Sequence, residues 1–198
     1  MRVFLAIPLP AILQQKIAEH VAPLGQRLPA ARYTPASYLH LTLHFFGERS
    51  AQHVAEIAVA LEPVLAEHRP FELEIEAAGA FPASRPRVLW LGIARSESLL
   101  SLHRDVTQAL AALGEELEER PYHPHLTLAR AKAPWRRGHL ETLRDALREL
   151  GEESFGVQSI VIFESHLGPG GSRHEKRVEL RLSGGMRSSS HGSFQSPE

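Results

Sequence analysis

The chain has 198 residues, with 22 Lys and Arg against 23 Asp and Glu, a hydrophobic fraction of 43% and no cysteine. Such a composition is typical of a globular protein, and the length suffices for one large domain or two small lobes. The lack of cysteine excludes disulfides, thiolate nucleophiles, thiolate zinc sites and iron–sulfur clusters. A net charge of -1 argues against a protein that coats long nucleic acids, although it permits a local basic site.

The sequence predicts no membrane segment. The apolar run at the start of the chain ends in Pro8 and Pro10, and it is too short to span a bilayer. No signal-peptide cleavage site follows it, and no run of about 18 apolar residues occurs elsewhere. We therefore expect no membrane partner and a cytoplasmic location.

Strands and helices are mixed along the chain. In chain order, the patterns predict a strand over 2–7, a helix over 10–20, a strand over 39–46, a helix over 51–66, strands over 71–77 and 87–93, a helix over 97–113, a strand over 125–130, a helix over 138–150, and strands over 155–163 and 175–182. The strand over 71–77 is the clearest, because its apolar residues alternate with three glutamates. This mixture predicts an α+β fold with mainly antiparallel sheets.

The composition changes at residue 183. Nine of the 16 residues in 183–198 are Ser or Gly, and they show no hydrophobic periodicity. Such a segment buries too little apolar surface to fold, so we expect a flexible tail.

One tetrapeptide occurs twice. Residues 40–43 read His-Leu-Thr-Leu, and residues 125–128 repeat these letters 85 positions later. Each copy lies in a predicted strand that is followed by a predicted helix, so an internal duplication explains the repeat. We therefore expect one bilobal domain over residues 1–182, in which each lobe contributes one strand to a shared cleft.

Strand geometry explains the spacing within each copy. Side chains two residues apart on a strand point to the same face, so His40 lies beside Thr42, and His125 lies beside Thr127. The leucines between them point into the core of each lobe. The duplication therefore predicts a site with two imidazoles and two hydroxyls.

This set of groups fits the cleavage of a phosphodiester. In-line displacement at phosphorus needs one group that takes a proton from the nucleophile and another that gives a proton to the leaving oxygen. Two histidines that titrate near 6.5 can share these roles at neutral pH. The threonine hydroxyls can bind the non-bridging oxygens. Arg130 would add positive charge, but strict alternation turns it away from His125 unless the strand bends there.

A metal site is the competing interpretation. His40 and His44 have the i, i+4 spacing that binds zinc on a helix. On a strand, four residues span about 13 Å, which is too far for a shared ion. His123 and His125 share a face, but Pro124 lies between them and no carboxylate is near in sequence. We therefore expect no metal.

The paired motifs resemble those of the 2H phosphoesterase superfamily, and among its members the sequence is similar to the RNA 2′,3′-cyclic phosphodiesterases, also known as 2′-5′ RNA ligases. The similarity extends over five segments: 2–7 (RVFLAI), 40–48 (HLTLHFFGE), 85–92 (RPRVLWLG), 120–130 (RPYHPHLTLAR) and 163–167 (FESHL). It therefore covers about residues 2–182 and leaves out only the tail.

The resemblance implies a bilobal α+β fold whose antiparallel sheets face each other across a cleft, with helices outside. It implies hydrolysis of a terminal RNA 2′,3′-cyclic phosphate to a 2′-phosphate, without a metal ion or other cofactor. His40 would protonate the departing 3′ oxygen, and His125 would activate water. Thr42 and Thr127 would bind the phosphate. The reverse geometry, with an RNA 5′-hydroxyl in place of water, would form a 2′-5′ linkage.

Aromatic residues beside the first motif are candidates for contact with the substrate. Alternation nominally places His44 and Phe46 on the face of His40, and either Phe45 or Phe46 is a candidate to stack on a base. His44 is a weaker candidate. We expect the partner to be RNA that ends in a 2′,3′-cyclic phosphate, and the protein to be a monomer.

Two other functions remain open at this stage. One is a 2H phosphodiesterase that acts on small cyclic nucleotides or on ADP-ribose cyclic phosphate. The other is a module that binds RNA ends without catalysis, although the intact motifs argue against it.

Overall fold

The computed structural model describes residues 1–27, 31–168 and 171–184. Residues 185–198 of the predicted tail lie outside the described residues. The strands are β1 (Arg2–Pro8), β2 (Ala31–Tyr33), β3 (His40–Glu48), β4 (Phe71–Phe81), β5 (Val88–Ile93), β6 (His125–Ala131), β7 (Ser154–Val157), β8 (Ser159–Gly168) and β9 (Gly171–Arg181). The helices are α1 (Ala11–Val21), α2 (Leu24–Arg27), α3 (Ala51–Glu67), α4 (Glu97–Ala112) and α5 (Arg137–Ala146), with short 3-10 helices η1 (Ala36–Tyr38) and η2 (Arg148–Glu152).

The strands form antiparallel ladders in the order β7-β4-β5-β6-β3-β1-β8-β9, and β2 pairs with β6 outside this path. The predicted α+β fold with antiparallel sheets and helices is therefore confirmed. We call β1, β3, β8 and β9 the β3 half, and β2, β4, β5, β6 and β7 the β6 half. The two predicted sheets are not separate, because β3 and β6 join these halves.

The joint between the halves is short. Leu41 and Leu126 form the one residue pair between β3 and β6 in the described part of the chain. Beyond it, β2 takes the place of β3 along β6, where Tyr33 pairs with Ala129 and Ala31 with Ala131. The two central strands therefore diverge immediately after the motifs meet.

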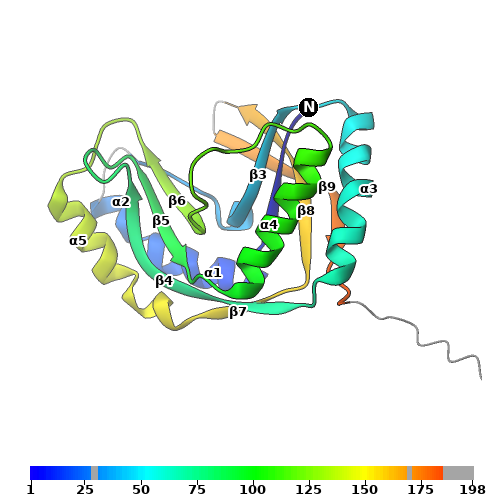
Figure 1. Cartoon of the computed structure of the whole chain (residues 1–198). Coiled ribbons are helices and arrows are strands. Elements are labelled where there is room, and N and C mark those ends of the chain that lie inside the picture. Colours follow the sequence, from blue (N-terminus) through cyan, green and yellow to red (C-terminus); the bar gives the residue numbers. More distant parts are fainter. Residues whose placement is uncertain (28–30, 169–170, 185–198) are drawn as a thin grey trace, which may run out of the picture.

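The helices are exchanged between the halves (Figure 1). Helix α4 connects β5 to β6, yet it packs against α3, which covers β9 of the β3 half. Helix α1 follows β1, but it packs with α2 on the side of α5, and Lys16 of α1 forms an ion pair with Glu153 just after η2. Among the helices of the described residues, none is long and apolar enough to cross a membrane.

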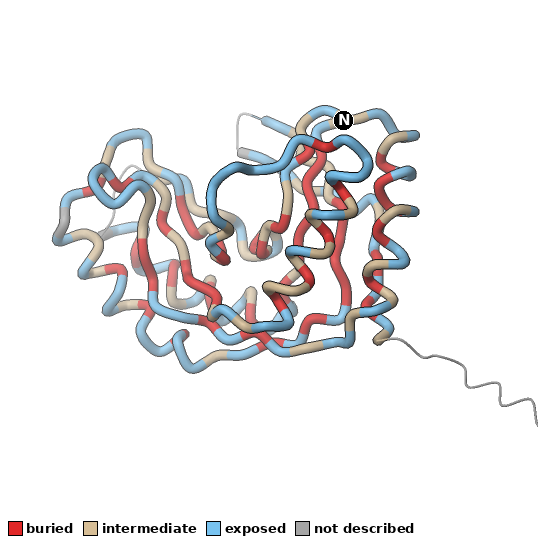
Figure 2. Tube along the Cα trace, in the orientation of Figure 1, coloured by how far each residue is buried: buried red, intermediate tan, exposed pale blue. Residues whose placement is uncertain are grey.

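The core runs through both halves, and buried segments follow the strands in each of them (Figure 2). In α3, the apolar positions at helical spacing are the buried ones, and Ser50 caps the helix by accepting a hydrogen bond from the His53 amide at 3.1 Å. Each helix therefore contributes one apolar face to the core.

Several element boundaries differ from the predictions. The predicted strand over 155–163 is two strands, because the chain crosses at Gln158 from β7, which pairs with β4, to β8, which pairs with β1. The predicted helix over 138–150 ends at Ala146 and continues as η2. The short elements α2 and β2 were not predicted, because three or four residues carry no readable periodicity.

Candidate active site

The two repeated motifs meet at the joint between β3 and β6. Leu41 pairs with Leu126, and both side chains are completely buried. An antiparallel pair has local twofold symmetry, so this register places His40 across from Thr127 and Thr42 across from His125. The sequence repeat thus becomes a symmetric arrangement of four polar side chains around one leucine pair.

The two faces of each motif differ as strand geometry predicts. The four leucines of the motifs are at most 5% exposed. The histidines and threonines between them are half-buried, and they lie on the opposite face. The prediction that the leucines enter the core is therefore confirmed.

A bulge in β3 changes the alternation after Thr42. Thr42 pairs with Ala6, and Phe45 pairs with Phe4, although Ala6 and Phe4 are only two residues apart on β1. Directly paired residues share a face, so Phe45 lies on the same face as Thr42 and His40. The ring of Phe4 lies 4.7 Å from that of His40 and 6.0 Å from that of Phe45. Phe45 is 68% exposed and therefore accessible beside His40.

The same bulge removes two predicted neighbours of His40. His44 pairs with Leu5, which points to the other face of the sheet. Phe46 is 4% exposed and lies in the core, where its ring is 4.8 Å from that of His44. The prediction that His44 and Phe46 share a face with His40 is therefore wrong, because the bulge shifts the alternation by one residue.

A matching bulge in β6 brings Arg130 to the site. Thr127 pairs with Trp90, and Arg130 pairs with Val88, two residues away on β5. Arg130 therefore lies on the face of Thr127 and His125, as the predicted bend requires. Phe45 and Arg130 occupy equivalent positions of the repeat, so one half contributes an aromatic ring where the other contributes a cation.

Each motif histidine is fixed by the same local hydrogen bond. Nδ1 of His40 lies 2.7 Å from the carbonyl oxygen of Tyr38, and Nδ1 of His125 lies 2.7 Å from that of His123. A carbonyl oxygen only accepts, so both Nδ1 atoms carry a hydrogen and donate it. In the neutral ring, Nε2 is then the free acceptor, and in the charged ring it is a donor. Both rings therefore offer Nε2 for proton transfer.

The environment of the two rings disfavours their charged forms. Burial is the main cause that lowers the pKa of His40 to about 4, and the charges of His174, His125 and Arg130 lower it further against the hydrogen bond to Tyr38, which raises it. Burial is also the main cause that lowers the pKa of His125. The expectation that both histidines titrate near 6.5 is therefore wrong for the free protein. A bound anion would oppose these shifts, because it stabilises the imidazolium.

An aromatic cluster surrounds each histidine. The rings of Phe163 and His174 lie 6.1 and 5.3 Å from that of His40. The rings of Phe81 and Trp90 lie 5.2 and 6.3 Å from that of His125. The sequence did not identify these four residues as neighbours of the motif histidines, because pairing between distant strands brings them there.

Tyr122 lies between α4 and β6, just before the second motif, and contacts the first motif. Its ring stacks on His103 of α4 with a centroid distance of 3.8 Å. Its hydroxyl donates a hydrogen bond to the carbonyl oxygen of Thr42 at 3.2 Å. Burial raises the pKa of this hydroxyl, which therefore stays protonated. The segment that leads into His125 is thus attached to the first motif.

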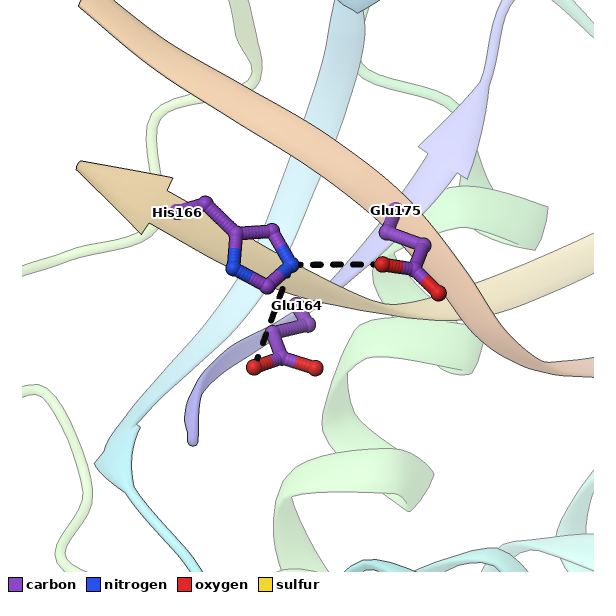
Figure 3. A group of neighbouring side chains, drawn as sticks. All are labelled: Glu164, His166 and Glu175. Atoms are coloured by element: carbon purple, nitrogen blue, oxygen red, sulfur yellow. Dashed lines mark hydrogen bonds and ion pairs between the residues drawn. The ribbon is translucent and has the colours of Figure 1, made fainter. Parts of the chain in front are cut away.

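A second group of titratable residues lies on the β8–β9 hairpin (Figure 3). Nε2 of His166 lies 3.3 Å from Glu175 and 3.9 Å from Glu164, a spacing that a metal ion can bridge. Arg177 already pairs with both carboxylates, at 3.3 Å to Glu164 and 2.9 Å to Glu175. Arg177 offsets part of the charge of the two acids, so the group is an ion-pair network on the hairpin. Glu175 follows His174 directly on β9, so the network faces away from His40.

Comparison with known proteins agrees with this geometry. Residues 13–169 match the family model of the 2′-5′ RNA ligase superfamily. A protein of Methanothermobacter thermautotrophicus named RNA 2′,3′-cyclic phosphodiesterase is 32% identical over 91% of this chain and 98% of its own length. A protein of Geobacillus stearothermophilus with the same name is also 32% identical over 83% of the chain, which spans 52% of that relative's length.

A solved structure shows the same architecture. The crystal structure of Escherichia coli LigT complexed with 3′-AMP has a TM-score of 0.72 and 28% identity, over 92% of this chain and 98% of that one. The matched range of this chain, residues 13–169, contains both histidine–threonine motifs. The chain therefore belongs to the 2′-5′ RNA ligase superfamily.

Proposed function

We propose that the protein hydrolyses the 2′,3′-cyclic phosphate at the end of an RNA to a 2′-phosphate. The observation that carries the proposal is the symmetric placement of His40 and His125, each fixed through Nδ1, on one face with Arg130. The relatives named RNA 2′,3′-cyclic phosphodiesterase support the choice of substrate.

The geometry suits proton transfer on both sides of phosphorus. Following the resemblance, Nε2 of His125 takes a proton from water as its oxygen attacks the phosphorus. Nε2 of His40 gives a proton to the 3′ oxygen as the bond between that oxygen and phosphorus breaks. Binding of the anionic phosphate raises the pKa of His40 from its low value in the free protein, so the ring can carry the proton it donates.

The neighbouring side chains suit the remainder of the substrate. The hydroxyls of Thr42 and Thr127 are placed to donate to the phosphate oxygens, and the guanidinium of Arg130 stabilises the charge that builds on them. Phe45 is exposed on the same face and is the ring that we assign to stack on the terminal base. Phe46 and His44 are not assigned a contact with substrate.

Substitution of the histidines tests the mechanism. We expect His40→Ala and His125→Ala each to lower the rate of cyclic-phosphate opening by at least about a hundredfold. The measurement is the single-turnover rate with an RNA that ends in a 2′,3′-cyclic phosphate. His20→Ala, on α1, is the control, because His20 pairs with Glu149 away from the motifs. A wild-type rate in either motif variant would exclude the mechanism.

A substrate panel tests the choice of RNA. The competing function is a 2H phosphodiesterase of small cyclic nucleotides or of ADP-ribose cyclic phosphate. Opening of these small molecules but not of RNA ends would favour it. Binding of RNA ends without turnover would favour a non-catalytic module. Formation of 2′-5′ linkages is measured in the same reactions by supplying an RNA with a 5′-hydroxyl.

The single-domain organisation over residues 1–182, the cytoplasmic location, the monomeric state and the absence of a metal requirement stay predictions. Light scattering tests the monomer, and cell fractionation tests the location.

A further inference from the structure

A second arginine lies directly opposite Arg130 on the neighbouring strand β2. In the ladder between β2 and β6, Arg32 pairs with Arg130. Directly paired residues share a face, so Arg32 lies on the face that carries Arg130, Thr127 and His125. Both arginines are exposed.

This arrangement is unfavourable without an anion. Like charges directly across an antiparallel ladder destabilise it. The ion pairs found among residues 1–27, 31–168 and 171–184 include neither Arg32 nor Arg130. The next residues on the same β2–β6 ladder are Tyr33 and Ala129 on one side and Ala31 and Ala131 on the other, and none of them is acidic. The pair is therefore a ready site for negatively charged groups.

The two guanidinium groups are suited to different phosphates. Arg130 comes from the motif strand itself, and its charge acts on both His40 and His125. Arg32 comes from β2, which pairs with β6 beyond the point where β3 stops pairing with it. Arg130 is thus placed at the reacting phosphate, and Arg32 lies beyond it on the same face.

We propose that Arg32 binds the phosphate that precedes the terminal nucleotide, which is its 5′-phosphate. This inference rests on the proposed function, and it specifies the substrate as an RNA end with at least one phosphate beyond the cyclic one. A nucleoside 2′,3′-cyclic phosphate has no group for Arg32. The site therefore distinguishes RNA ends from the smallest cyclic nucleotides by charge.

Four combinations of protein and substrate test the proposal. The substrates are adenosine 2′,3′-cyclic phosphate with and without a 5′-phosphate, and the proteins are the wild type and Arg32→Gln. We expect the wild type to prefer the 5′-phosphorylated substrate by about tenfold in kcat/KM, through KM, because the contact is the same in ground state and transition state. In Arg32→Gln, the ratio of kcat/KM for the phosphorylated and unphosphorylated substrates falls towards one. Arg32→Lys keeps the charge without the bidentate geometry, and its ratio lies between the two.

Arg148→Gln is the matched control, because Arg148 is an exposed arginine that pairs only with Asp145 among the described residues. It keeps the wild-type ratio. An equal loss for both substrates in Arg32→Gln would overturn the proposal and place Arg32 at the cyclic phosphate. A wild-type ratio of one would also overturn it.

A binding measurement separates this inference from the proposed function. Adenosine 5′-monophosphate contains the 5′-phosphate but no cyclic phosphate. Calorimetry is expected to show weaker binding of it to Arg32→Gln than to the wild type, and this difference shrinks as salt is raised. If neither cyclic phosphate is opened, the proposed function fails, while this measurement still decides the role of Arg32. Equal affinities in the two proteins would overturn that role.

Discussion

The hydroxyl of Tyr122 donates a hydrogen bond to the main-chain oxygen of Thr42 at 3.2 Å. Thr42 belongs to the first motif, and Tyr122 lies three residues before His125 of the second. The bond therefore connects the two motifs at a point where β3 and β6 have already stopped pairing. It holds the strand of His125 in place beside Thr42.

Tyr122→Phe removes only this hydroxyl. We expect kcat to fall by about two- to tenfold, because a partly buried hydrogen bond is lost and the motifs lose one connection. The pH dependence keeps its shape, since neither histidine changes its ring environment. Tyr33→Phe is the matched control, because the Tyr33 hydroxyl is buried without a partner among the described residues. Equal activities of the two variants would exclude a positioning role for Tyr122.

Arg130→Gln is expected to reduce kcat by about 10²–10³-fold, the range seen when one donor to a developing oxyanion is removed. Thermal denaturation should change little, because Arg130 is exposed. Arg130→Lys restores part of the rate through its charge. If Arg130→Gln raised KM and left kcat unchanged, the result would contradict a role of Arg130 in stabilising the transition state.

The titration of His40 tests the electrostatics of the site. In the free protein, its NMR resonances are expected to titrate near the pKa of about 4 that burial imposes. Addition of adenosine 2′-monophosphate should raise this pKa, because the phosphate stabilises the imidazolium. A pKa that is unchanged by the nucleotide would contradict the proposed place of the phosphate. The rate of hydrolysis should follow a bell-shaped pH profile, since one histidine must be neutral and the other charged.

Glu115 anchors the segment that leads from α4 to β6. Its side chain accepts hydrogen bonds from Arg49 at 2.6 Å and from His53 at 2.6 Å, and it is 2% exposed. Glu115→Gln is expected to lower the free energy of unfolding by about 1–3 kcal/mol. Glu118→Gln is the control, because the Glu118 side chain is 62% exposed.

The effect of Glu115→Gln should depend on pH. The hydrogen bond to Glu115 raises the pKa of His53. The stability that this bond contributes is therefore complete below 6.5, the pKa of His53 in the unfolded chain, and it is lost as pH rises through the pKa in the folded protein. The hydrogen bond from Arg49 lowers the pKa of Glu115. The stability that the Glu115 carboxylate contributes is therefore lost as pH falls through its pKa in the folded protein. Urea denaturation should therefore show a larger difference from the wild type at about pH 6 than at about pH 9. An equal difference at both would exclude the His53 contact.

Removal of metal ions tests the proposed chemistry. Hydrolysis should survive dialysis against EDTA, because two imidazoles supply the proton transfers and Arg130 supplies the positive charge. Loss of activity that Zn²⁺ or Mg²⁺ restores would favour the metal interpretation. Glu164→Gln on the hairpin network would then show whether that group holds the ion.

The repeated tetrapeptide predicted the centre of the site because strand periodicity is a local property. His40 and Thr42, and equally His125 and Thr127, lie on one face in the structure. The sequence also indicated that Arg130 could reach this face only at a bend, and the bulge after Thr127 supplies that bend.

The bulge in β3 was not predictable, and it reversed the expected positions of Phe45 and Phe46. A bulge depends on how the neighbouring strand pairs, and that information is not local to residues 40–48. The same reason applies to His174 and to Arg32, which come from strands without any motif. Their places follow from the ladders β8–β9 and β2–β6 alone.

The exchange of helices means that neither copy of the repeat is a separable protein. A fragment that ends before β4 would retain α3 without α4, and it would lack β8 and β9 beside β1. The complementary fragment would lose α1 and α2 from the side of α5, together with β2 from the edge of β6. Either fragment would expose large apolar surfaces that the other half covers in the intact chain. The two halves that carry the repeated motif therefore depend on each other for folding.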